Sequence, residues 1–196
     1  MEEREITDRV YKFLEETVLI LQNTYKGFES QKIDLLKESK IKFKESVTKW
    51  LPEAEKLVED KNKNEVAKRF AIALPHLQRV TLALDNLVHK METKVEDKVL
   101  FHTKAHDEVK QIMEAVVVEF TDVKDFCMTK NPKLKKDIQV DIVKIGKMID
   151  DFNHVYQNQL ITGVGKLRAS YLYVEMTDSL KRMANELAAF IEKAYP

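Results

Sequence analysis

The scarcity of turn-forming residues constrains the fold of this chain more than any other feature. Only four glycines and four prolines occur in 196 residues. All-β folds need these residue types for their many turns, so their scarcity favours a few long elements. Hydrophobic residues make up 44% of the chain and charged residues 34%, a balance typical of a folded chain with long, charge-rich helices.

Six segments carry apolar residues at steps of three and four, the spacing that places side chains on one face of a helix. In the last segment, Leu180, Met183 and Leu187 follow this spacing. Most of the aromatic residues lie on these apolar stripes and are expected in the core, whereas Trp50 receives no role from the pattern. The expected helices cover residues 3–25, 30 to about 58, 64–92, 103 to about 130, 133–160 and 166–194.

Individual residues mark where these helices should begin, bend and end. Gly27 is the expected stop of the first helix, since glycine accepts the left-handed conformation. Pro75 should bend the third helix, because it removes a backbone donor. Thr103 is the expected N-cap of the fourth helix, and Asn131-Pro132 places proline at the tolerated start of the fifth.

The third and sixth segments repeat one pattern. At an offset of 103 residues, Leu77 matches Leu180 and Arg79 matches Arg182, and the first and fourth segments align more loosely. We therefore predict an all-α fold of six long helices that form two tandem antiparallel three-helix bundles. The predicted domains are 1–93 and 103–196, with a linker at 94–102. Both leucines should lie in the core and both arginines at its edge.

The charge balance disfavours nucleic-acid binding. Lysine plus arginine equals aspartate plus glutamate at 33 each, whereas nucleic-acid binders usually carry a basic excess. A local cluster of lysines at 130, 133, 135 and 136 is interpreted as a solvated turn between helices. No signal peptide is expected, and apolar runs such as Ala115 to Val118 are too short to span a bilayer. We expect a cytoplasmic protein.

Candidate catalytic and metal-binding residues do not form a recognisable pattern. No Glu-x-x-His pair occurs, and His102 should lie outside the helix that carries His106, which misaligns this pair. Cys127 sits on an apolar stripe and is expected to be buried rather than reactive. Gly163 to Lys166 lacks the spacing of a phosphate-binding loop and is interpreted as a turn. We therefore expect no enzymatic activity and no cofactor.

Two matching segments resemble the third helix of the PhoU family. They are Leu77-Gln78-Arg79-Val80, continuing to Asn86-Leu87, and Leu180-Lys181-Arg182-Met183. The linker from Leu100 to Val109 is similar to the family's entry into its fourth helix. The family consists of two such three-helix units in tandem, and the resemblance covers essentially the whole chain. It implies a cytoplasmic regulator of phosphate uptake and phosphate signalling that contacts a phosphate transporter and a sensor kinase.

The resemblance also identifies the positions of the family's metal-binding Glu-x-x-x-Asp motifs, and these positions are altered here. They hold Gln78 and Leu82 in the first unit, and Lys181 and Asn185 in the second. Leucine cannot ligate a metal and lysine would repel one, so we expect no metal. Glu175 and Asp178, three residues apart, are the remaining acids that could form an incomplete site.

Two functions from different classes follow as expectations. The first is a PhoU-like, non-enzymatic regulator or accessory protein that binds a phosphate transporter component or a sensor kinase. The second is a helical scaffold or membrane-peripheral adaptor unrelated to phosphate. The lysines of the second helix, from Lys32 to Lys49, offer a partly basic face for a membrane, although Glu38 and Glu45 dilute it. For the first function, contact with a membrane is expected to be only indirect, and association into a homodimer stays open.

Overall fold

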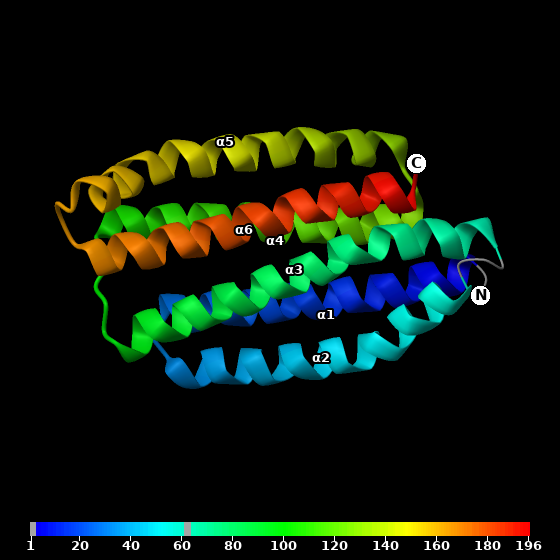
Figure 1. The fold of residues 1–196 in the computed structure, drawn as a ribbon, viewed down its shortest axis with the longest axis horizontal. Coiled ribbons are helices and arrows are strands. Elements are labelled where there is room, and N and C mark those ends of the chain that lie inside the picture. Colours follow the sequence, from blue (N-terminus) through cyan, green and yellow to red (C-terminus); the bar gives the residue numbers. More distant parts are fainter. Residues whose placement is uncertain (1–2, 61–63) are drawn as a thin grey trace.

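Six long helices make up the part of the chain that the structure describes. The computed structural model describes residues 3–60 and 64–196 and contains no strand in these ranges (Figure 1), which confirms the all-α prediction. The helices are α1 (Glu3–Glu29), α2 (Ile33–Asp60), α3 (Glu65–Glu96), α4 (Thr103–Thr129), α5 (Pro132–Thr162) and α6 (Leu167–Ala194).

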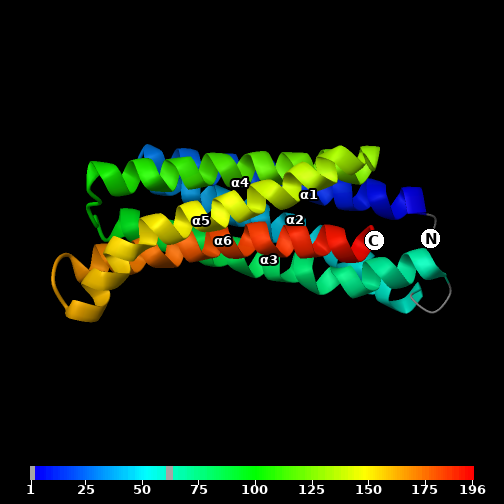
Figure 2. The ribbon, with the colours of Figure 1, turned by 90° about the horizontal axis from the view of Figure 1, so that it is seen from above.

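Consecutive helices run antiparallel, so that the molecule is an elongated bundle (Figures 1 and 2). The three helices of each triplet contact one another, and α1 also packs against α4. The most extensive contact in the molecule joins α3 to α6. The turns α1–α2, α3–α4 and α5–α6 lie at one end of the bundle, and both described chain ends lie at the other (Figure 1).

One continuous apolar core runs through both triplets. Leu77 and Leu180 are buried, whereas Arg79 and Arg182 are exposed beside them, so the predicted core face is confirmed at all four positions. The division into two separate three-helix bundles stays a prediction. The predicted linker is shortened at its start, because α3 continues to Glu96.

The predicted start of the fifth helix is confirmed, and the third helix begins with a similar asparagine cap that was not predicted. Pro132 opens α5, and the Asn131 side chain accepts a hydrogen bond from the Lys133 backbone N–H at 3.0 Å. Asn64 caps α3 by accepting a hydrogen bond from the backbone N–H of Ala67 at 2.9 Å. In both places the asparagine oxygen satisfies a donor that has no partner inside the helix.

Two other predicted helix ends are wrong. Gly27 lies inside α1, which continues to Glu29. A Cβ at Gly27 would meet the Leu36 side chain at 3.0 Å, so this glycine permits the close approach of α2 rather than ending α1. Thr103 is the first helical residue of α4, and His102 occupies the cap position without a side-chain hydrogen bond to the helix.

Candidate functional site

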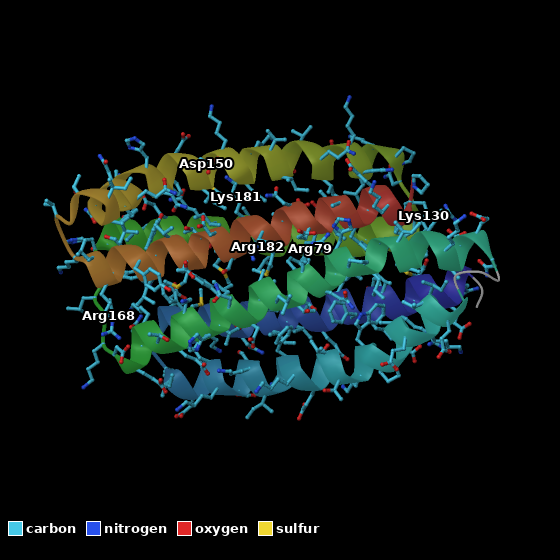
Figure 3. All side chains as sticks on the ribbon, in the orientation of Figure 1. Arg79, Lys130, Asp150, Arg168, Lys181 and Arg182 are labelled. Atoms are coloured by element: carbon cyan, nitrogen blue, oxygen red, sulfur yellow. The ribbon has the colours of Figure 1, made fainter. Side chains whose placement is uncertain are left out.

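The seam between α3 and α6 brings the two repeated segments together. The two helices cross antiparallel, and Arg79 and Arg182 lie close together near the middle of the molecule (Figure 3). Beneath them the equivalent residues Val80 and Met183 are buried. The apolar stripes thus fix the register of the two helices and leave their polar edges at the surface.

Polar side chains join the two helices along this seam. Glu186 forms an ion pair with Arg79, with 2.8 Å between Glu186 Oε2 and Arg79 Nε, and the same oxygen lies 2.7 Å from His76 Nδ1. Asn86 donates a hydrogen bond to Ser179 Oγ at 2.8 Å. These bonds connect residues about a hundred positions apart in the chain, so they hold the seam in one arrangement.

The Glu186 carboxylate on α6 contacts two basic side chains of α3, Arg79 and His76. Partial burial acts to raise its pKa, but the hydrogen bonds and charges of Arg79 and His76 outweigh this effect and lower the pKa below its usual value. Glu186 is therefore ionised at neutral pH. It neutralises Arg79, whereas Arg182 has no ion-pair partner among the described residues.

Arg182 lines a hollow of about 120 Å³ together with Leu82, Glu175 and Asp178. Within the described residues Arg182 makes no hydrogen bond or ion pair, and it acts on Asp178 through charge. Burial and the nearby Glu175 raise the pKa of Asp178, against the opposing effect of the cations. Leu82 is 68% exposed at the edge of this hollow.

The four positions of the family's metal motifs do not converge on one site. Gln78 lines a separate hollow between α2 and α3, whereas Leu82 faces the hollow with Arg182. Lys181 pairs with Asp150 on α5, and Asn185 is exposed. In residues 3–60 and 64–196 no group of three or more His, Cys, Asp or Glu side chains could hold a metal ion.

The other sequence candidates have structural roles. His102 is exposed outside α4, whereas the His106 ring stacks on Phe28 at 5.1 Å, so the two histidines form no pair. Cys127 is buried, which confirms the prediction, and burial raises its pKa to about 11. Such a thiol is a poor nucleophile at neutral pH. Gly163 ends α5 in the left-handed conformation, so the predicted α5–α6 turn is confirmed.

The lysine cluster that begins at Lys130 is more than a solvated turn. Lys130 Nζ lies 3.5 Å from the centre of the Tyr195 ring, and Lys135 donates a hydrogen bond to the Tyr195 carbonyl. Burial lowers the pKa of Lys130. The interpretation as a wholly solvated turn is therefore wrong for these two lysines, which attach the end of α6 to α4 and α5.

The basic face predicted on α2 is largely neutralised. Lys40 pairs with Glu92 at 2.7 Å and Lys37 pairs with Glu96 at 3.1 Å, both on α3. Lys42 pairs with Glu38, and Lys49 lies 3.7 Å from Glu16. These pairs remove most of the free positive charge that a lipid-binding face requires.

Two buried glutamates on α4 were missed by the sequence analysis. Glu108 accepts hydrogen bonds from Tyr173 at 2.9 Å and Tyr156 at 3.1 Å. Burial and this carboxylate raise the pKa of both tyrosines. Glu119 is 1% exposed, and its Oε1 has no hydrogen-bond partner among the described residues. Both glutamates lie three residues from an apolar stripe member, Ala105 and Val116, which is the signal that could have identified them.

Trp50 lies in the core face between α1 and α2. Its ring is buried and stacks on Phe13, with 5.1 Å between the ring centres. The two rings form one wall of a groove of about 320 Å³, whose rim carries Arg9 and Glu53 as an ion pair. The residue that the sequence left without a role therefore packs α2 onto α1.

Comparison of the chain with protein-family models, curated proteins and solved structures finds no match. No helix in the described ranges is long and apolar enough to cross a membrane.

Proposed function

We propose that this chain is a PhoU-like, non-enzymatic regulator or accessory protein of phosphate transport or phosphate signalling, and that it acts in the cytoplasm by contact with a protein partner. The observation that carries the proposal is the α3–α6 seam. The two segments that resemble the family's third helices, around Arg79 and Arg182, pack directly on one another.

The exposed middle of the seam has the composition of a protein-binding surface. Leu82 is exposed next to Arg182, which has no ion-pair partner among the described residues. Interfaces favour an apolar contact beside an arginine that a partner carboxylate can reach. Bonds across the seam, such as Asn86 to Ser179, hold this surface in place. A surface held in advance loses little conformational entropy on binding. The expected partner is a helix or loop with an aliphatic residue next to an acid.

The chemistry of the altered positions favours contact over metal binding as the mechanism. At Leu82 a metal ligand is replaced by an apolar side chain that a partner can bury. At Lys181 a cation is paired with Asp150 where the family has a carboxylate, and a cation disfavours a metal. We propose that the seam has kept its shape and become a binding surface that needs no metal.

Deletion and complementation test this role. Removing the gene should alter phosphate uptake or its regulation, and the wild-type chain should restore it. Leu82→Glu and Arg182→Glu should fail to restore it, because they place negative charge where the partner docks. The matched control is Ile72→Glu, at an exposed position of α3 away from the seam's hollow. If deletion leaves phosphate uptake and its regulation unchanged, and the purified chain binds no phosphate-transport component, the proposed role is wrong.

A further inference from the structure

One end of the bundle carries aliphatic side chains on its two outermost turns. The α5–α6 turn projects farthest at this end, and the α3–α4 connection lies beside it (Figure 1). Ile161 is 82% exposed and Val164 69% exposed on the first turn, and Leu100 is 72% exposed on the second. A hollow lined by residues of both turns, including His102 and Lys166, shows that the turns are neighbours.

These aliphatic residues belong to ordered turns. Val164 stands between Gly163 and Gly165, which both have positive φ, +70° and +102°, so the backbone turns sharply and presents Val164 at the tip. Next to Leu100, the Phe101 ring packs against Phe28 with 6.2 Å between ring centres. The packed Phe101 therefore anchors the connection that carries Leu100, and the two glycines set the conformation of the turn that carries Val164.

The exposed aliphatic side chains lie in two stretches of sequence that contain no acids. Residues 152–174 contain no aspartate or glutamate, and neither do residues 98–106, in a chain with 33 acids. Lys98 and Lys166 make no ion pair within the described residues. Arg168 pairs with Asp97, and Lys104 lies 3.7 Å from the buried Glu108. The free positive charge is thus beside the aliphatic tips.

We infer that this end of the bundle, defined by Leu100, Ile161, Val164, Lys98 and Lys166, docks on the surface of a bilayer that contains anionic lipids. Aliphatic side chains at the tip enter the boundary between headgroups and acyl chains, and the flanking lysines bind lipid phosphates. A protein partner would be expected to supply acids against the lysines and a shaped pocket for the tips. A bilayer needs neither, and it accepts tips that protrude from two separate turns.

This inference does not depend on the proposed role in phosphate regulation. The docking end lies at the tips of the bundle, whereas the partner-binding surface around Leu82 lies on its side. A chain docked through this end would keep the α3–α6 seam accessible. Failure of lipid binding would leave the phosphate proposal standing, and the reverse also holds.

Vesicle co-sedimentation tests the inference. The full chain should sediment with phosphatidylcholine vesicles that contain phosphatidylglycerol, and much less with phosphatidylcholine alone. Ile161→Ser combined with Val164→Ser should lower the partition coefficient at least about tenfold, because both insertions are lost. Lys98→Glu combined with Lys166→Glu should abolish the preference for anionic vesicles. High salt should weaken binding of the wild type.

Matched control variants distinguish binding through this end of the bundle from non-specific binding of vesicles. Val140→Ser combined with Val143→Ser removes aliphatic side chains that are also exposed, on the outer face of α5, and should bind as the wild type does. Lys110→Glu combined with Lys147→Glu is the equivalent charge control. All of these positions are exposed, so the variants should fold.

A label gives an independent readout of insertion. Because Cys127 is buried, Val164→Cys introduces an exposed thiol for an environment-sensitive fluorophore, and Val143→Cys provides the control site. Emission at position 164 should shift to the blue with anionic vesicles, and emission at position 143 should not. Equal sedimentation with both vesicle types, equal loss in the control variants, or capture of a protein through these residues without lipid binding would overturn the proposal.

Discussion

Glu119 should make the stability of the protein fall as the pH rises. Its side chain is 1% exposed, and one carboxylate oxygen has no hydrogen-bond partner among the described residues. Burial, reinforced by the charges of Asp122 on α4 and Asp141 on α5, raises its pKa from 4.5 to about 8. In the folded protein the carboxyl therefore stays protonated at neutral pH, whereas in the unfolded chain it is ionised.

The sign and size of the effect follow from proton binding. Between pH 4.5 and about 8 the folded state binds a proton that the unfolded state has released, so the free energy of unfolding decreases as the pH rises. Above pH 8 both states are ionised and this dependence ends. At about 1.4 kcal/mol per pKa unit, the total decrease is on the order of 3–5 kcal/mol.

Glu119→Gln removes the ionisable group while it keeps the shape of the side chain. Urea unfolding followed by helical circular dichroism at pH 5, 6, 7, 8 and 9 gives the free energy of unfolding of each variant. Across this pH range the free energy of unfolding should fall steeply in the wild type. In Glu119→Gln it should fall by about 3–5 kcal/mol less. Glu114→Gln, at an exposed position of α4, should keep the slope of the wild type. Parallel curves for all three proteins would show that the ionisation of Glu119 does not control the pH dependence of stability.

Three further outcomes are expected. Leu77→Ala and Leu180→Ala should each lower the free energy of unfolding by about 2–5 kcal/mol in urea titrations, because both side chains are buried at equivalent positions; little loss at both would show that the core face is misassigned. Tyr173→Phe should lower the free energy of unfolding by about 1–3 kcal/mol, because it removes a hydrogen bond to the buried Glu108. An unchanged unfolding midpoint would show that this hydrogen bond does not stabilise the fold. Chelation should leave the melting temperature unchanged, because we expect no bound metal. The prediction would be contradicted if the purified protein held stoichiometric iron or zinc and if chelation removed this metal and lowered the melting temperature.

The helices could be predicted from the sequence because their signal is local. Apolar spacing identified all six segments, and side chains such as Asn64 and Asn131 satisfy backbone donors within a few residues. The structural role of Gly27 could not be predicted from local sequence in the same way. Its role depends on the distance between α1 and α2, and that distance is a property of the packed bundle.

The site was only partly predictable, since its bonds connect distant segments. The repeat placed Arg79 and Arg182 in equivalent positions. Sequence alone did not show that Glu186 pairs with Arg79, or that Arg182 has no ion pair in the described part of the chain. Glu108 and Glu119 were not singled out from the sequence, because most glutamates are exposed. Their burial depends on α5 and α6 covering α4, so the partners that surround them are visible only in the folded molecule.

Site-specific photo-crosslinking at Leu82 determines whether the α3–α6 seam touches a partner in the cell. A photoreactive amino acid is placed at position 82, and in a second strain at the exposed position 72 on the same helix. We expect a covalent adduct at position 82 with a phosphate transporter component or a sensor kinase, and none at position 72. The absence of an adduct at position 82, or the same adducts at both positions, would contradict this expectation.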